Sequence, residues 1–364
     1  MIRVGLVGFG LGGRVFHAPL LSSVEGLELA AVLERSTNNA AERYPGLTTC
    51  RSLDQMLADP TITLFVVSTP AGSHFDLARQ ILEAGRNVVI DKPMCTSSAQ
   101  VAQLMELASA RRLLLAPFHN RRWDNDFQTI QNLLHEGSLG RLVHFQSNFD
   151  RWSPGPTRRP WKDDPTQGAL LLDLGTHLAD QALVLFGKPE AVSCESLHER
   201  ECEGANDSFT LRLRYPGLWA TLSANCLSTI PRPRFHLRGT RGNYVKWGLD
   251  PQEAALAKVT RLPNAPWPQE PAEKWGTLSV DGSLSVDGAL SALIAGGIVT
   301  RPLAPVQADY RCYYAGIRDA LLGKSPAPVA PIAAWRVARL LEWASQSAAE
   351  RREIPCDWTQ EPPI

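Results

Sequence analysis

Two side chains in the second half of the chain, Asp173 and His177, are suited to proton transfer. They lie four residues apart in the run from Gly168 to Gln181, so the sequence predicts that they share one face of a helix. A carboxylate beside an imidazole can orient the ring, and an oriented His with a pKa near neutrality can remove a hydroxyl proton. A solvated Asp–His pair on a helix surface is the alternative interpretation of these two residues alone.

Asp180 follows on the same predicted helix, and two carboxylates with one imidazole can also bind zinc or iron. We expect no metal here, because no further His or Cys cluster lies nearby in the sequence and hydride transfer does not need a metal. The sequence therefore favours acid–base chemistry at His177.

Lys92 is the next candidate, because it follows a short apolar run. The run from Asn87 to Ile90 is predicted to be a strand, and Asp91-Lys92-Pro93 would lie at its carboxyl end, where open α/β sheets bind ligands. An ammonium group there can donate a hydrogen bond to a carbinol or carbonyl oxygen and stabilise the negative charge that develops on it. A surface lysine ahead of a helix is the alternative, and we expect Asp91 and Lys92 to lie beside a cofactor as well.

Gly8, Gly10 and Gly13 form a Gly-x-Gly-x-x-Gly pattern directly after the apolar run from Ile2 to Val7. Such glycines permit a tight turn, close approach of a pyrophosphate to backbone N–H groups, and packing of the next helix. The position directly after an amino-terminal strand makes the pattern more specific than the same glycines in any loop. The sequence predicts a dinucleotide site in which Leu11 also takes part, with an ordinary glycine turn as the alternative.

Glu34 lies at the end of the second predicted strand, where a carboxylate can accept hydrogen bonds from the adenine ribose hydroxyls and repel a 2′-phosphate. Arg35 and Ser36 follow, and an Arg at this place can accommodate the 2′-phosphate of NADP. We predict NAD as the cofactor, with NADP as a close alternative and Glu34 and Arg35 as contacts. A solvated charge pair is the third interpretation.

Thr69, Pro70 and His74 follow the fourth predicted strand, so we expect them beside the cofactor, although His74 is equally suited to capping a helix. Asn120 and Arg122 lie at the crossover between two domains, where clefts form. We predict that both contact substrate, with salt bridging as the alternative role for the arginine.

A long loop between Arg151 and Pro165, rich in Pro, Arg and Trp, is long enough to suspect a function. Trp161 in this loop is a candidate substrate contact.

Alternating apolar runs and helical patterns over residues 1–116 predict parallel strands joined by crossover helices. Pro19 should make the first helix kinked or late. Helices are predicted from Ser73 to Ala84, stopped by Gly85, and from Ala99 to Ala110, capped by Ser97 or Ser98. The predicted strands are Ile2–Val7, Leu29–Leu33, Thr63–Val67, Asn87–Ile90 and Leu113–Ala116.

After residue 120 the pattern changes to helices followed by a run of strands, which predicts an α+β domain with an antiparallel sheet. We place a Rossmann domain at 1–120 and a substrate-binding and oligomerisation domain at 121–364, and expect the final helices to pack back on the first domain. The predicted helices are Asp124–Leu134, Gly168–Phe186, Asp309–Leu322 and Ile332–Glu350, and the strands are Ala191–Leu197, Ser208–Tyr215, Trp219–Cys226, Phe235–Arg238 and Tyr244–Trp247.

The chain of 364 residues has 37 basic and 37 acidic side chains, so no net charge draws it toward nucleic acid or anionic lipid. No apolar run approaches the roughly 20 residues of a membrane helix, and the amino end lacks a signal pattern. Its seven scattered cysteines argue against a disulfide framework. We therefore expect a cytoplasmic protein that binds small molecules, without nucleic-acid or membrane partners.

Three separated motifs resemble the glucose-fructose oxidoreductase and inositol dehydrogenase family, also called Gfo/Idh/MocA, over essentially the whole chain. They are the Gly8–Gly13 loop, Asp91-Lys92-Pro93, which resembles the family's Glu-Lys-Pro, and the Asp173–His177 pair. The branch of scyllo-inositol dehydrogenases is resembled most by three further stretches, Phe16–Leu20, His119–Phe127 and Gly242–Glu253.

The resemblance implies an NAD(P)-dependent dehydrogenase that moves a hydride between a secondary hydroxyl of a cyclic polyol or sugar and the nicotinamide. It implies that Lys92 contacts the substrate oxygen and the nicotinamide side, that His177 is the acid–base residue, and that Asp173 supports it. It also implies a large, open, mostly antiparallel sheet through which members pair as dimers or tetramers. Asp91 replaces the usual Glu, and Glu34 differs from the small or basic residues of NADP-using members.

A protein of another class, a non-catalytic NAD(P)-binding sensor or regulatory subunit, is the competing hypothesis. The combination of Lys92, Asp173 and His177 favours the enzyme, because a binding protein has no need of an aligned proton acceptor.

Overall fold

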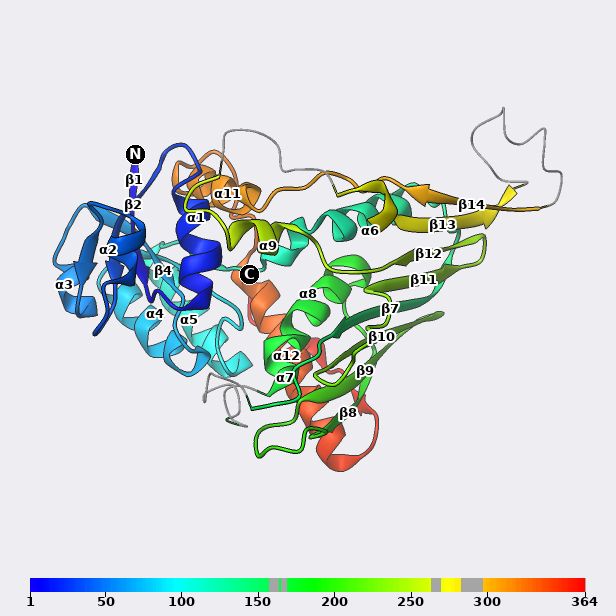
Figure 1. The fold of residues 1–364 in the computed structure, drawn as a ribbon. Coiled ribbons are helices and arrows are strands. Elements are labelled where there is room, and N and C mark those ends of the chain that lie inside the picture. The colour runs from blue at the N-terminus through cyan, green and yellow to red at the C-terminus, as the bar shows by residue number, and fades with distance from the viewer. Residues whose placement is uncertain (157–163, 165–168, 263–269, 283–296, 364) are drawn as a thin grey trace.

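The computed structural model describes residues 1–156, 164, 169–262, 270–282 and 297–363. Two sheets organise this part of the chain, a six-stranded parallel sheet and a nine-stranded, mostly antiparallel sheet (Figure 1). The α/β fold class is therefore confirmed. Trp161 and most of the loop that holds it lie outside the described residues.

The first sheet has the strand order β3-β2-β1-β4-β5-β6, with every pair parallel. This is the 3-2-1-4-5-6 order of dinucleotide-binding folds, in which ligands lie beyond the carboxyl ends of the strands next to the switch point. The sequence missed only the short β3. The strands are β1 Ile2–Val7, β2 Leu27–Leu33, β3 Thr48–Cys50, β4 Ile62–Val67, β5 Asn87–Ile90 and β6 Leu115–Pro117.

The first helix is irregular but does not start late, so only part of the expectation from Pro19 holds. Residues 11–21 are helical throughout, and a π-helical segment, η1 (Gly13–His17), leads directly into α1 (Ala18–Leu21), which contains Pro19. Gly85 ends α4 with a φ of +74°, and the Ser97 side chain caps α5. The other helical elements here are α2 Asn39–Arg43, α3 Leu53–Leu57, η2 Ala71–Ser73, α4 His74–Glu83 and α5 Ser98–Arg111.

The second sheet has the order β14-β13-β12-β11-β7-β10-β9-β8-β15, and its β10–β7 pair is parallel. The sequence did not predict the central strand β7, because it buries the polar side chains of Ser147 and Asn148 and lacks a simple apolar alternation. The strands are β7 Leu142–Asp150, β8 Ala191–Leu197, β9 Ser208–Tyr215, β10 Leu218–Asn225, β11 Phe235–Gly239, β12 Gly242–Lys246, β13 Gly276–Asp281, β14 Ile298–Leu303 and β15 Ile354–Pro355.

The single helix predicted over residues 168–186 is wrong. The structure has two helices, α7 (Leu170–Asp173) and α8 (Gly175–Phe186), with an interruption at Leu174. Gly175 directly follows, and a glycine disfavours a continuous helix through its backbone freedom. Asp173 and His177 therefore belong to different helices.

The remaining helical elements are η3 Asn120–Trp123, α6 Asn125–His135, α9 Gln252–Leu256, η5 Ala272–Lys274, α11 Arg311–Leu321, α12 Pro331–Glu350 and η7 Trp358–Gln360.

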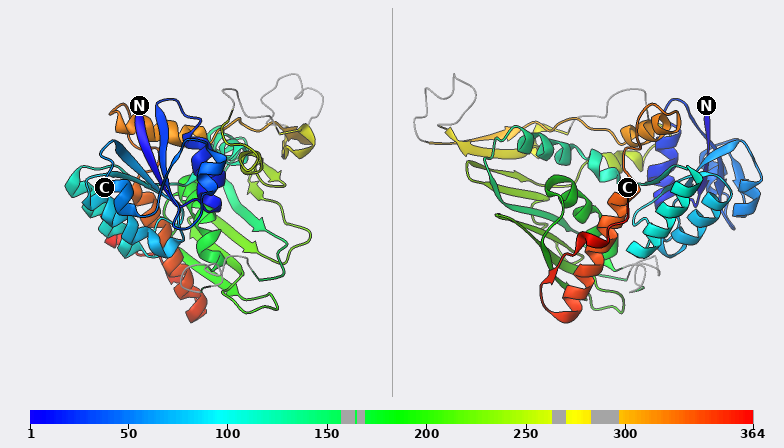
Figure 2. Two further views of the ribbon diagram at one scale, coloured as in Figure 1. Left: turned by 60° about the vertical axis from the view of Figure 1, so that its left-hand side comes forward. Right: turned by 180° about the vertical axis from the view of Figure 1, so that it is seen from behind.

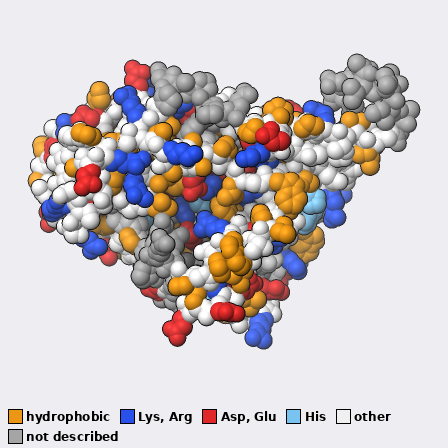
Figure 3. Space-filling view, in the orientation of Figure 1, with side chains coloured by type: hydrophobic (Ala, Val, Ile, Leu, Met, Phe, Trp, Pro, Cys, Tyr) orange, Lys and Arg blue, Asp and Glu red, His pale blue; other side chains and the backbone are white. Residues whose placement is uncertain are grey.

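Helices cover only one face of the nine-stranded sheet (Figures 1 and 2). The closing helices α11 and α12 join the two halves, since Tyr313 and Tyr314 pack beneath the first sheet and Trp335 joins a cluster with Val101 and Leu104 of α5. None of the helices in the described ranges is long and apolar enough to cross a membrane. Figure 3 shows basic and acidic side chains interspersed over one face, as their equal numbers predict.

Candidate active site

A cavity of about 1250 Å³ lies between the carboxyl edge of the first sheet and the second half of the chain. Its walls come from the glycine loop, the ends of β2, β4 and β5, the start of η3, helices α7 and α8, and the segment around α9. Of the predicted site residues, the structure brings to this cavity Gly8, Gly10, Leu11, Glu34, Arg35, Thr69, Pro70, Asp91, Lys92, Asn120, Asp173 and His177.

The glycine loop fits a dinucleotide, because its glycines have two different roles. Gly8 has a φ of +102°, and a Cβ on Gly13 would lie 2.3 Å from the carbonyl oxygen of Gly8. A Cβ on Gly10 would have no atom within 4 Å. Gly8 and Gly13 are thus required by the turn itself, whereas Gly10 keeps open the space that a pyrophosphate needs.

Glu34 is buried at the end of β2 and binds the following turn. Its Oε1 accepts a hydrogen bond from the Thr37 hydroxyl at 2.6 Å, and its Oε2 accepts one from the Ala40 N–H at 2.8 Å. Arg35 and Ser36 are exposed and line the cavity beside it. Glu34 therefore lies at the end of β2 and lines the cavity, as predicted, but it also stabilises the start of α2.

His74 does not line the cavity. Its Nε2 lies 2.8 Å from the carbonyl oxygen of Thr69 and its Nδ1 lies 2.9 Å from that of Pro93. The buried ring therefore links the loop after β4 to the loop after β5. Burial lowers the pKa of His74, so the ring is neutral at pH 7. His74 therefore supports two walls of the site. It was predicted to contact the cofactor, but it does not line the cavity.

Asp91 is an internal anchor of the loop that carries Lys92. Its carboxylate accepts hydrogen bonds from the Lys92 N–H at 2.7 Å and the Ser68 hydroxyl at 3.0 Å, and it lies 3.3 Å from His17 Nε2. Burial alone would raise the pKa of Asp91, but His17, Lys92 and His74 together hold it at about 2. His17 also lies 2.6 Å from the Tyr314 hydroxyl. His17 was not predicted to have a role, although it lies in the resembling stretch Phe16–Leu20.

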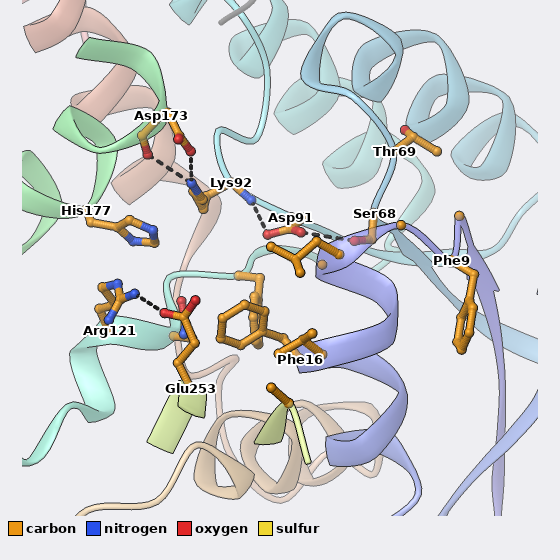
Figure 4. Close-up of a pocket in the computed structure, with 18 of the residues that line it drawn as sticks. Phe9, Phe16, Ser68, Thr69, Asp91, Lys92, Arg121, Asp173, His177 and Glu253 are labelled. Atoms are coloured by element: carbon orange, nitrogen blue, oxygen red, sulfur yellow. Dashed lines mark hydrogen bonds and ion pairs between the residues drawn. The ribbon is translucent and has the colours of Figure 1, made fainter. Parts of the chain in front are cut away.

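The ammonium group of Lys92 is bound by Asp173. Lys92 Nζ donates to Asp173 Oδ1 at 2.6 Å and to the carbonyl oxygen of Asp173 at 2.9 Å. Figure 4 shows His177 pointing into the same space, with no hydrogen bond drawn between it and Asp173. The expectation that Asp173 orients the His177 ring is therefore corrected, because the break at Leu174 turns the carboxylate toward Lys92.

The expectation of a near-neutral pKa for His177 is also wrong. Burial, followed by the charges of Lys92 and Arg121, lowers the pKa of His177 well below its usual value, whereas the Asp173 carboxylate raises it. The imidazole is therefore neutral at pH 7. A neutral ring beside an ammonium group can accept a proton from a hydroxyl that the ammonium polarises.

Arg122 does not reach the cavity, contrary to prediction. Its Nε and Nη2 donate to the two carboxylate oxygens of Asp180 at 2.8 and 2.6 Å, so the salt-bridge interpretation holds for this residue. Its neighbour Arg121 lines the cavity instead and pairs with Glu253. Within the described ranges, no group of three or more His, Cys, Asp and Glu side chains is arranged to hold a metal ion.

Comparison with known proteins agrees with this geometry. Residues 2–119 match an oxidoreductase family with an NAD-binding Rossmann fold, and residues 127–245 match the GFO/IDH/MocA C-terminal domain. The chain belongs to the Gfo/Idh/MocA family. This confirms the resemblance that the three motifs carried and identifies the chain as a member of an NAD-binding oxidoreductase family.

Several relatives of this Gfo/Idh/MocA protein match it over nearly their full length. The uncharacterized oxidoreductase YdgJ of Escherichia coli is 37% identical over 97% of this chain and 98% of its own. The scyllo-inositol 2-dehydrogenase (NADP(+)) IolW of Bacillus subtilis is 32% identical over 97% of this chain and 95% of its own. The solved structure of the Yersinia pestis protein YPO2259 has a TM-score of 0.89 and 38% identity, over 98% of this chain and 97% of that one.

Proposed function

We propose that this family member is an NAD(P)-dependent dehydrogenase acting on a secondary hydroxyl of a cyclic polyol or sugar. The observation that carries the proposal is the shared cavity, in which Lys92 Nζ and the neutral His177 ring face a space that the glycine loop keeps open for a dinucleotide. The similarity to a scyllo-inositol 2-dehydrogenase supports an inositol-like substrate. A bound nicotinamide would supply the hydride acceptor or donor.

The protein's own contribution is proton transfer and charge stabilisation. An ammonium group has three N–H donors, and Asp173 accepts from Lys92 at two positions. The remaining N–H donates to the carbinol oxygen and stabilises the negative charge that develops there. His177 accepts the hydroxyl proton, and its low pKa keeps it unprotonated beforehand. In the reverse direction the same ring returns the proton.

The preferred cofactor in this proposal is NAD. Each Glu34 oxygen accepts one hydrogen bond within the protein, and a carboxylate oxygen can accept a second, so the ribose hydroxyls still have acceptors. The same negative charge disfavours a 2′-phosphate. Arg35 and the NADP(+) in the name of IolW support NADP as the alternative. The ratio of kcat/KM for NAD to that for NADP decides between them.

A polyol and sugar panel, assayed with NAD and NADP by reduced-nicotinamide absorbance, tests the proposal. Lys92→Ala and His177→Ala should each lower kcat/KM about 100-fold or more, while nucleotide binding stays nearly unchanged. Normal turnover by both variants would show that these roles are wrong. Failure of every polyol alongside tight nucleotide binding would favour the non-catalytic sensor.

We further propose a cytoplasmic homodimer or homotetramer that pairs through the open face of the nine-stranded sheet. All seven cysteines are free in the structure, which suits a reducing compartment. Exposed tryptophans on or beside that sheet, Trp219 and Trp247, support the interface.

A further inference from the structure

A second pair of opposite charges, Arg121 and Glu253, lies in the same cavity as Lys92 and Asp173 (Figure 4). Arg121 Nη2 donates to Glu253 Oε2 at 2.6 Å. The two residues come from η3 and α9, which are far apart in the sequence. His177 lines the same cavity, and Arg121 is near enough for its charge to lower the pKa of the His177 ring, so the pair borders the space in which a substrate would react.

Arg121 is held rigidly and is almost fully buried. Its Nη1 lies 3.4 Å from Asp124 Oδ2, its guanidinium carbon lies 5.0 Å from the centre of the Phe149 ring, and its carbonyl oxygen accepts from the Gln181 amide. Burial alone would lower the pKa of Arg121, but Asp124, Tyr310 and Glu253 raise it, so the charge is permanent. A fixed cation of this kind holds the Glu253 carboxylate in place and can donate a hydrogen bond to a hydroxyl oxygen beside it.

Glu253 is the more accessible partner, with 40% of its side chain exposed against 6% for Arg121. The turn before it is fixed by hydrogen bonds from the N–H groups of Asn125 and Gln252 to Asp250, at 2.7 and 2.9 Å. The Gln252 amide also donates to the Trp123 carbonyl oxygen at 2.8 Å. The carboxylate is thus presented to the cavity from the first turn of α9, whose start is bound to the same region as Arg121.

We propose that the Arg121–Glu253 pair is a second hydroxyl-binding site, which binds substrate hydroxyls away from the reacting carbon and selects neutral polyols over sugar acids. The inference rests on the proposed polyol dehydrogenase function. A vicinal diol can donate to the carboxylate and accept from the guanidinium, while both charges stay paired. A substrate carboxylate placed there would face Glu253, and like charges in a partly buried site repel each other.

The substitution Glu253→Gln tests whether the negative charge of this side chain, and not its shape, determines substrate preference. The amide keeps the size and the hydrogen-bonding ability of the side chain but leaves Arg121 without its neutralising partner in the cavity. We expect kcat/KM for the best neutral polyol or sugar to fall roughly tenfold, mainly through a higher KM. For D-glucuronate relative to D-glucose, we expect kcat/KM to rise roughly tenfold or more. The KM for the nicotinamide nucleotide should stay unchanged.

Glu83→Gln is the matched control, because it removes the carboxylate from an exposed Arg–Glu pair on α4, where Arg79 Nη1 lies 3.2 Å from Glu83. Its substrate ratio should equal that of the parent protein. Nucleotide binding, followed by fluorescence, and the thermal midpoint show whether each variant is folded. If Glu253→Gln binds nucleotide normally yet leaves the glucuronate-to-glucose ratio unchanged, the selection role is wrong. If the parent protein oxidises no polyol or sugar, the proposed function itself fails, which is a separate result.

Discussion

The hydrogen bond between Lys92 Nζ and Asp173 sets the position of the ammonium group, so its loss should affect the chemical step directly. Asp173→Asn removes the charge while keeping an acceptor of similar shape. We expect kcat to fall about 10- to 100-fold, since a hydrogen bond to a charged group contributes about 1.5–3 kcal/mol. Steady-state kinetics and nucleotide titration check this. An unchanged kcat would show that the backbone carbonyl of Asp173 suffices to hold Lys92.

The low pKa of His177 predicts the pH dependence of oxidation. Burial, Lys92 and Arg121 all disfavour the protonated ring, so the ring is the required base at every pH above its lowered pKa. As the pH falls, kcat/KM for the polyol should therefore stay high through pH 6.5 and decline only well below it. A profile of kcat/KM between pH 4 and pH 8 measures this decline, the acidic limb of the profile.

Asp173→Asn gives a control on that assignment, because the Asp173 carboxylate raises the pKa of His177. In this variant the acidic limb should move to still lower pH. A limb at or above pH 6.5 in the parent protein, or no shift in the variant, would contradict His177 as the titrating base.

Residue types were easier to predict than their partners. Lys92, Asp173 and His177 were all predicted as site residues because their chemistry is visible in the sequence, and the structure places the three side chains around one cavity. The partner of Asp173 was not predicted, because a spacing of four residues predicts contact only within an unbroken helix. Nothing in the sequence marked Glu253 as a site residue except its place in the stretch Gly242–Glu253, which resembles scyllo-inositol dehydrogenases. Its partner Arg121 is distant in the sequence and contacts it only in the folded chain.

At the scale of elements, the glycine loop allows two kinds of effect to be separated. Gly10→Ala places a methyl group in open space, so the protein should fold normally but bind nucleotide roughly tenfold or more weakly. Gly13→Ala forces a Cβ to 2.3 Å from the Gly8 carbonyl oxygen, so the free energy of unfolding should fall by about 1–3 kcal/mol. Thermal unfolding and nucleotide titration of both variants distinguish the two. Equal destabilisation by both would contradict this division of roles.

The elements of the first sheet were predictable because their strands are continuous apolar runs with glycine or serine punctuation, as at Gly85 and Ser97. The second sheet was harder. Strands β13 and β14 pair at one edge of that sheet. β14 exposes most of its residues, β13 buries only Gly276 and Leu278, and β15 has two residues, so none carries a strong apolar pattern. Tertiary pairing, which a local pattern cannot show, determines these strands.

At the scale of the whole molecule, the chain returns to its first sheet after completing the second. Tyr313 donates its hydroxyl to the Pro117 carbonyl oxygen at 2.9 Å, and Glu342 of α12 accepts from the N–H and hydroxyl of Ser98 at 2.7 and 2.8 Å. These contacts tie α11 to β6 of the first sheet and α12 to α5. We propose a domain boundary at residue 120, with α11 and α12 as a shared support for both domains.

The open face of the nine-stranded sheet gives the prediction for assembly. Trp219 of β10 is 49% exposed, while its neighbours Ala220 and Leu222 are fully buried, so its side chain lies on the uncovered face. Trp219 lies opposite Arg214 of the neighbouring strand β9. The substitution Trp219→Arg therefore adds a second positive charge to the uncovered face. Buried interface tryptophans contribute about 2 kcal/mol or more, so the dimer dissociation constant should rise roughly 30-fold. Sedimentation velocity over a range of concentrations measures it.

The matched control for assembly is Leu322→Arg, because Leu322 is 53% exposed directly after α11, away from the nine-stranded sheet. This variant should assemble like the parent protein. Trp219→Arg should keep the fold and the thermal midpoint of the monomer, because the side chain contributes little to the core of one chain. If the parent protein is monomeric at micromolar concentration, or if both variants dissociate equally, the open face is not the interface. Dissociation by Trp219→Arg alone would show that the sheet, which a single chain leaves uncovered, is completed by a second copy.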